Sequence, residues 1–148
     1  MKTPSRNFHH WLMLAGTLPF LLGAGLLVLG ISPGFLAVDT ILVLKSYTLA
    51  IISFMAGVHW GQSFAQIERA NLLRVLSNVF CLTPWFLMIT GVSNTVFFIG
   101  SAMVFITLLA VDYRLERVEA ISSDYLRART TVTAVVCGSL VVSAIGST

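Results

Sequence analysis

The sequence contains five long apolar runs that short polar links separate, at residues 8–30, 40–64, 72–91, 96–112 and 129–146. Each run approaches the ~20 residues that a helix needs to cross the hydrocarbon core of a bilayer. Of the 148 residues, 57% are hydrophobic and 10% are charged, whereas about a quarter are charged in a soluble domain. A water-soluble domain of this length could not bury so much apolar surface. The sequence therefore predicts an all-α, polytopic membrane protein, a single domain (residues 1–148) built as a bundle of five transmembrane helices.

The basic residues predict how these helices are oriented. If the amino terminus is cytoplasmic, Lys45 alone lies on the outer side, and an excess of Lys and Arg is typical of cytoplasmic loops. We therefore expect a multi-pass protein of a bacterial inner membrane, with a cytoplasmic amino terminus and a carboxyl terminus outside. The basic residues on the cytoplasmic side would be Lys2, Arg6, Arg69, Arg74, Arg114, Arg117, Arg127 and Arg129.

Two features of the first run predict its shape and packing. Pro19 lies inside it and is expected to kink the helix, because proline lacks a backbone donor and crowds the preceding turn. Gly16, Gly23 and Gly30 recur every seven residues, so they share one stripe on which another helix backbone can come close. Glycines scattered without such a role are the alternative.

The second run combines glycines with a histidine. Gly57 and Gly61 form a GxxxG pair, which predicts close packing against a neighbouring helix. At about 100° per residue, His59 points to the opposite face of the helix, so the two faces should contact different neighbours. In the last run, Gly138 belongs to a stripe of small residues that also predicts helix packing.

A block around this histidine carries a family resemblance. Residues 53–61 read SFMAGVHWG, Tyr47 precedes them, and residues 125–130 read YLRART. These residues resemble the family of small membrane proteins called domain of unknown function 3429, which includes the human transmembrane protein 69. The resemblance extends over most of the chain. It implies an integral membrane protein with five spans, present in bacteria and eukaryotes, and assigns no activity.

Polar residues inside the apolar runs suggest a ligand pocket. A histidine in a membrane helix is rare and indicates a functional site, although His59 could also serve as a structural hydrogen bond between helices. Asp112 ends its run on the same side of the membrane. The two could form a buried His/Asp/Arg network, while a charged rim wetted by solvent is the commoner arrangement. The predicted pocket would be lined by Tyr47, His59, Trp60, Asn78 and Asp112.

Three arginines suggest a second, more superficial site. Arg74, Arg127 and Arg129 lie near the starts of the third and last runs. Together with free backbone N–H groups at helix termini, guanidinium groups can bind an anionic lipid headgroup or phosphate. The positive-inside rule alone could also account for them. No metal or cofactor is expected, because the adjacent His9 and His10 do not have the spacing of ligands that converge on one metal.

The motifs present do not predict an enzyme. The sequence contains no GxSxG, CxxC, HExxH or phosphate-binding glycine loop, and its few arginines lie close to the membrane, which argues against nucleic-acid binding. Two functions therefore remain. The protein binds a lipid or other small ligand in the polar pocket near the cytoplasmic leaflet, or it is a structural or assembly subunit that docks onto itself or another membrane protein through glycine-rich helix faces. Its partners would be membrane lipids, a second copy or another membrane protein.

Overall fold

The computed structural model describes residues 6–31, 39–64, 70–116 and 122–148, and the side chains of residues 11–31, 39–64, 70–115 and 122–148. All regular secondary structure in these ranges is helical. Five helices or helix pairs are long and apolar enough to cross a membrane, which confirms the predicted all-α fold with five spans. The helices are α1 (Arg6–Ala15), α2 (Leu18–Leu29), α3 (Thr40–Gln62), α4 (Ala70–Ile89), α5 (Asn94–Glu116) and α6 (Ser123–Gly146).

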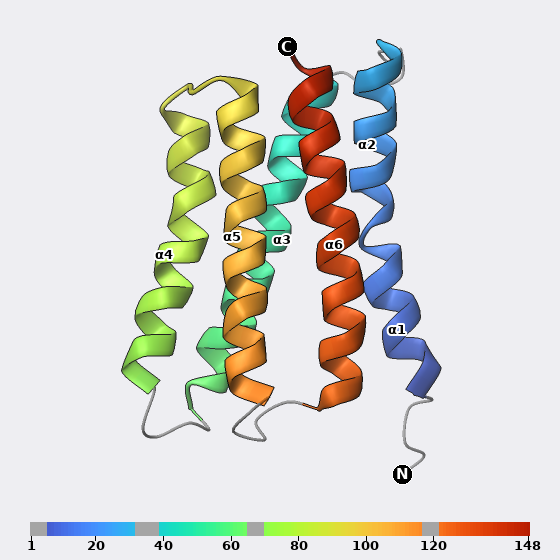
Figure 1. Cartoon of the computed structure of the whole chain (residues 1–148). Coiled ribbons are helices and arrows are strands. Elements are labelled where there is room, and N and C mark those ends of the chain that lie inside the picture. The colour runs from blue at the N-terminus through green and yellow to red at the C-terminus, as the bar shows by residue number, and fades with distance from the viewer. Residues whose placement is uncertain (1–5, 32–38, 65–69, 117–121) are drawn as a thin grey trace.

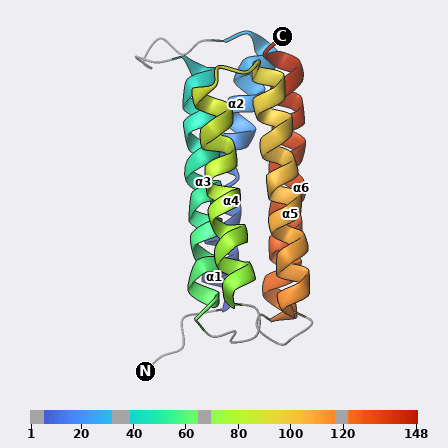
Figure 2. The ribbon, with the colours of Figure 1, turned by 90° about the vertical axis from the view of Figure 1, so that its left-hand side faces the viewer.

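The helices run nearly parallel and antiparallel to one another in a single bundle (Figures 1 and 2). Helix α3 packs against α2, α4 and α5, while α6 packs against α5, α2 and α1. We call the end at which α1 and α6 begin the lower end, and the opposite end the upper end (Figure 1). Because the number of spans is odd, α1 begins at the lower end and α6 finishes at the upper end.

The first span is interrupted within the turn before Pro19, the turn that a proline crowds. Helix α1 ends at Ala15, and α2 begins at Leu18, so that Pro19 lies in the first turn of a new helix. Proline is well tolerated there because the first-turn N–H groups have no partner within the helix. The chain breaks at Gly16 and Thr17, where the Tyr47 hydroxyl of α3 donates to the Gly16 carbonyl over 2.9 Å.

The last two spans extend further into the polar segment than the apolar runs indicated. Helix α5 continues past Asp112 to Glu116, and α6 begins at Ser123, six residues before the expected start at 129. The Ser122 side chain caps α6 by accepting a hydrogen bond from the Tyr125 backbone N–H, as serine commonly does. Arg127 and Arg129 therefore lie inside α6 rather than at its amino terminus.

The core contains large apolar side chains from most of the helices. Phe20 of α2, Ile52 of α3, Phe105 of α5 and Leu140 of α6 are almost completely buried. Phe20 contacts both Phe105 and Tyr47 through its ring. Aromatic rings bury large apolar areas and prefer such tilted and edge-to-face contacts, so Phe20 links α2 to α3 and α5 just above the break in the first span.

The glycine stripes predicted the packing only in part. Gly23 is buried, and an added Cβ would lie 3.0 Å from the Leu44 side chain of α3. At Gly57, Gly61 and Gly138, an added Cβ would meet no atom of the described residues within 4 Å. Those three glycines are therefore not packed against another described helix of this chain, and their packing against a second chain stays a prediction.

Gly16 and Gly146 differ in what surrounds them. An added Cβ at Gly16 would contact only carbonyls of the preceding turn, at 3.4 Å and beyond, so Gly16 marks the break rather than an approach to another helix backbone. At Gly146, by contrast, an added Cβ would lie 3.2 Å from backbone atoms of Leu27 and Val28. The backbones of α6 and α2 therefore come close at the upper end, a contact that the glycine stripes did not predict.

Candidate functional site

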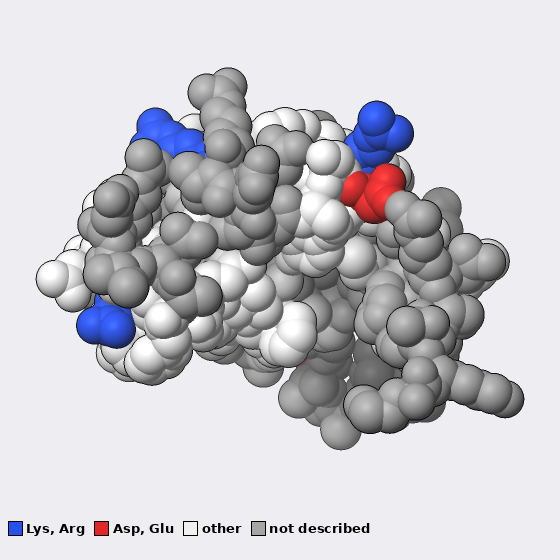
Figure 3. Space-filling view, turned by 90° about the horizontal axis from the view of Figure 1, so that it is seen from below, with Lys and Arg blue, Asp and Glu red and all other residues white. Residues whose placement is uncertain are grey.

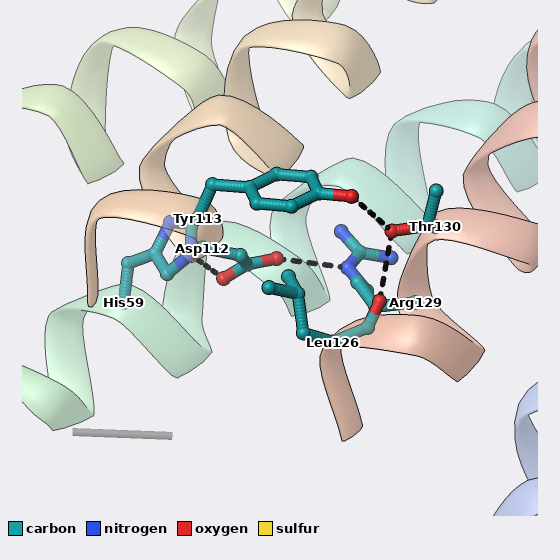
Figure 4. A network of polar contacts seen from close by, with 6 residues as sticks. All are labelled: His59, Asp112, Tyr113, Leu126, Arg129 and Thr130. Atoms are coloured by element: carbon teal, nitrogen blue, oxygen red, sulfur yellow. Dashed lines mark hydrogen bonds and ion pairs between the residues drawn. The ribbon is translucent and has the colours of Figure 1, made fainter. Parts of the chain in front are cut away.

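Three polar side chains from three helices meet inside the lower half of the bundle (Figure 4). His59 Nε2 of α3 lies 2.7 Å from Asp112 Oδ1 of α5, and Arg129 Nε of α6 donates to Asp112 Oδ2 over 3.1 Å. Their residues are only 2%, 2% and 3% exposed. Buried charges are costly unless they are paired and hydrogen-bonded, so this network fixes α3, α5 and α6 relative to one another.

The carboxylate determines which nitrogen of His59 carries a hydrogen. An ionised carboxylate only accepts hydrogen bonds, and Asp112 accepts from the Arg129 guanidinium at its other oxygen. His59 must therefore donate from Nε2. The second ring nitrogen, Nδ1, is buried and has no hydrogen-bond partner among the described residues. A lone pair without a partner is tolerated more easily in such a place than an N–H without one.

A second chain of hydrogen bonds lies beside this network on the outer surface of α5 and α6. The Tyr113 hydroxyl lies 3.0 Å from Thr130 Oγ1, which in turn donates to the Leu126 carbonyl over 2.8 Å (Figure 4). Tyr113 and Asp112 are neighbours in sequence on α5, but Tyr113 is exposed and Asp112 is buried. The two chains of contacts join the same two helices from inside and from outside.

The structure places only two of the five predicted pocket residues together. His59 and Asp112 are in contact, which supports the buried network rather than the solvated rim. Tyr47 lies about 18 Å from His59 along α3, at the break in the first span. Trp60 is 43% exposed, and Asn78 is exposed on α4, where its side chain donates to the backbone carbonyl four residues earlier.

Arg74 belongs to a separate cluster at the junction of α3 and α4. Its Nε donates to the Ser63 hydroxyl over 3.1 Å. Its guanidinium carbon lies 5.6 Å from the ring centroid of Trp60 and 5.3 Å from that of Phe64. Cation–π contacts of this kind are favourable within about 6 Å. Arg74 therefore anchors the lower end of α3 to α4.

The three arginines predicted to form an anionic site do not converge. Arg129 is buried against Asp112, Arg74 is held between α3 and α4, and Arg127 is exposed on α6. Seen from the lower end, the basic side chains lie apart at the edge of the described surface (Figure 3). Binding of an anionic headgroup stays a prediction for Arg74 and Arg127 as separate surface cations, and Arg129 is better placed for another role.

A cavity of about 730 Å³ lies beside the network formed by His59, Asp112 and Arg129. It lies between α1, α3 and α6, and Phe20 of α2 and Phe105 of α5 complete its wall. Arg129 is one of the residues that line it. Pockets for small ligands commonly measure about 300–1,000 Å³ and combine a mostly apolar lining with a few polar groups, which fits this cavity.

The polar lining of the cavity is concentrated on one face of α6. Ser122, Tyr125, Arg129 and Thr133 follow one another at intervals of three or four residues, the spacing that places side chains on a common helix face. Gln62 of α3 adds another polar group, and its Oε1 is buried and has no described hydrogen-bond partner. The apolar pattern did not indicate this face, because residues 113–128 have the composition of a polar link between two spans. The helical spacing of its polar residues was the signal that could have revealed it.

The rest of the lining is apolar. It comes mainly from α1 and α3, with single residues of α2 and α5 and two valines of α6, and consists of Leu12, Met13, Ile51, Phe54, Met55, Val58, Phe105, Val132 and Val136, with Gly16 and Phe20. Leu12 and Phe54 are also exposed on the outer surface of the bundle. The cavity therefore opens sideways between α1 and α3, toward the surface that the membrane would cover.

Comparison with known proteins identifies a family but no function. No curated protein and no solved structure matches the chain, so the likeness to the human transmembrane protein 69 stays a prediction. The sequence model of one family matches residues 5–145, and that family is described as a protein of unknown function, DUF3429. Since the match extends over nearly the whole chain, the protein belongs to the DUF3429 family, as its SFMAGVHWG block indicated.

Proposed function

We propose that the protein binds an amphipathic, lipid-like small molecule in the cavity between α1, α3 and α6. The observation that carries this proposal is the position of Arg129. This charged residue belongs to α6, one of the candidate membrane helices, and it lines a largely apolar cavity. Ionisable groups within membrane spans are rare and usually face a functional cavity or a partner. Here Arg129 has both, since Asp112 pairs with it from α5.

The distribution of polar groups indicates how such a molecule would lie. Gln62, Ser122 and Tyr125 line the lower part of the cavity, and Arg129 follows one turn above Tyr125. Higher in the bundle, the lining contains Phe20, Phe105 and Val136. A ligand with a polar end and an apolar chain would match this gradient if its polar end lay at the lower end of the bundle. It would enter from the bilayer between Leu12 and Phe54.

The proposal can be tested by mass spectrometry of the protein purified in a mild detergent. We expect a lipid-like molecule to remain bound to the native chain. Filling the cavity with Val58→Trp should remove it, whereas Val75→Trp, on the exposed surface of α4, should leave it in place. If both variants retain the same molecule, it binds elsewhere. If the native chain neither retains an amphiphile nor binds an added one, the proposal is contradicted.

A structural or assembly role remains the second candidate, because Gly57 and Gly61 lie open on the outer surface of α3. Small residues on an exposed membrane-helix face allow another helix to approach closely. In this case a protein, rather than a lipid, would remain bound after purification. Gly57→Leu and Gly61→Leu would then release that protein, while Val58→Trp would not.

A further inference from the structure

The charge balance around the cavity constrains the polar group of its ligand. We infer that the amphiphile carries an uncharged hydrogen-bond acceptor, such as an ester or ketone carbonyl, at the end that meets Arg129. This inference rests on the proposed function, because it describes the ligand of the same cavity. Four observations on His59, Asp112, Arg129 and Thr133 support it.

The first observation is that the described cavity lining offers no uncompensated charge. Among the described residues that line the cavity, Arg129 is the one with a formal charge. Its Nε lies 3.1 Å from Asp112 Oδ2, and both side chains are almost fully buried. The pair is therefore neutral as a unit. A ligand with a charged end would introduce a buried charge that no described group balances, which is strongly unfavourable.

The second observation is that His59 is not among the described residues that line the cavity. Its Nε2 lies 2.7 Å from Asp112 Oδ1, so His59 contacts the carboxylate of the pair. Arg129 is therefore the member of the network that a ligand in the cavity would meet.

The third observation is that Arg129 retains donors for an acceptor. A guanidinium has five N–H groups in a fixed planar arrangement. The described hydrogen bond of Arg129 uses Nε, and none of the described bonds uses either terminal nitrogen. A carbonyl oxygen in the cavity could accept from these groups without adding charge. Pairing with Asp112 fixes the orientation of the guanidinium beforehand, so little freedom would be lost on binding.

The fourth observation is the Thr133 hydroxyl, one turn above Arg129. Thr130 and Ser139 of the same helix donate to the carbonyl four residues earlier, as helix hydroxyls commonly do. Thr133 is only 3% exposed and lines the cavity, yet its Oγ1 has no hydrogen-bond partner in the part of the chain that the structure describes. A second uncharged polar group of the ligand, such as a hydroxyl, would satisfy it after a rotation about its side-chain bond.

The experiment compares amphiphiles that share one hydrocarbon chain and differ in charge. Monooleoylglycerol is uncharged, oleyl sulfate is anionic, and oleyl trimethylammonium is cationic. Binding of each is measured by native mass spectrometry on wild-type protein in phosphatidylcholine nanodiscs. We expect monooleoylglycerol to bind about tenfold more tightly than either charged probe, which corresponds to about 1.4 kcal/mol.

The outcomes separate this inference from the proposed function. If no probe binds, and none competes with a bound lipid, the cavity is not a ligand site and both proposals fail. If oleyl sulfate binds as tightly as monooleoylglycerol, the function stands and the inference is overturned. Equal or tighter binding of the cationic probe would overturn it as well.

Variants test whether Asp112 causes the preference. Asp112→Asn keeps the shape of the side chain and removes its charge, so Arg129 becomes an uncompensated cation. We expect the preference to move toward oleyl sulfate by about tenfold. Arg114→Gln removes an exposed charge two residues away and should leave the preference unchanged. An unaltered preference in a folded Asp112→Asn protein would overturn the inference, and the wild-type ranking decides it if that variant does not fold.

Discussion

At the scale of single residues, Asp112 is the side chain on which the lower half of the bundle depends. It accepts hydrogen bonds from α3 and from α6 while belonging to α5. Removing one partner of a buried ion pair destabilises a protein by more than the intact pair stabilises it, because the remaining charge is left buried and unpaired. The three members of the network should therefore differ in how much stability each of them controls.

We predict that Asp112→Ala lowers the free energy of unfolding by about 3–5 kcal/mol, because it leaves Arg129 buried without its partner. His59→Ala should cost less, since it removes one hydrogen bond and leaves the Asp112–Arg129 pair intact. Thermal unfolding in detergent measures both, with the exposed Arg114→Ala as a control. Equal melting temperatures for Asp112→Ala and the wild type would show that the network does not stabilise the bundle.

The Tyr47 hydroxyl offers a second prediction at this scale. Tyr47→Phe removes its hydrogen bond to the Gly16 carbonyl and should destabilise the protein by about 1 kcal/mol. Tyr113→Phe removes a hydroxyl contact of similar length on the exposed side of α5 and should cost less. The measurement is the difference in melting temperature between the two variants. A larger loss for Tyr113→Phe would mean that Tyr47 does not hold the break in the first span.

His59 and Asp112 also show what residue types can predict. A histidine and an aspartate at the same end of two spans indicated a possible buried network, because both are expensive in a membrane. The partner on α6 could not be singled out from Arg127 and Arg129, which are two residues apart. They differ in helical phase, since Arg127 faces outward and Arg129 inward, and that phase required the true start of α6 to be known.

At the scale of helices, apolar length predicted the spans better than charge predicted their ends. The expected boundaries for α3 and α4 lie within two residues of the observed ones at both ends. Those for α5 and α6 fall short by four and six residues, because Asp112, Arg127 and Arg129 resemble residues at a membrane surface. A charge paired inside a bundle cannot be distinguished by its type from a charge at an interface.

The glycines of α2 and α3 give a prediction at the same scale. Gly23→Leu should lower the melting temperature strongly, because its Cβ alone would lie 3.0 Å from Leu44 and overpacking strains a filled contact. Gly57→Leu should leave the stability of the single chain nearly unchanged, since nothing lies within 4 Å of its Cβ. Both variants are compared by thermal unfolding and by size-exclusion chromatography. Loss of an oligomer in Gly57→Leu alone would identify a docking surface for another chain.

At the scale of the whole molecule, the five-span count followed from apolar run lengths, whereas the cavity did not. Its lining comes from five helices, and the residues that contribute to it are far apart in sequence. The break at Gly16, which positions α1 beside the cavity, receives a hydrogen bond from Tyr47 of α3. Such features arise from how the helices are assembled, so the residue pattern within one helix does not predict them.

The orientation in the membrane remains a prediction, based on the excess of basic residues at the lower end. We expect the amino terminus in the cytoplasm and the carboxyl terminus outside. A Thr148→Cys variant without Cys81 and Cys137 would be treated with a membrane-impermeant thiol reagent. Labelling of intact cells is the expected result. Labelling only after the cytoplasm is opened would reverse the assignment.

Because α1 begins at one end of the bundle and α6 finishes at the other, two copies of this chain cannot be fused head to tail and keep the same orientation. A short linker would place the second copy upside down relative to the first. A fusion with a sixth spanning helix as the linker would restore parallel copies. The odd number of crossings thus determines which gene fusions this fold can accommodate.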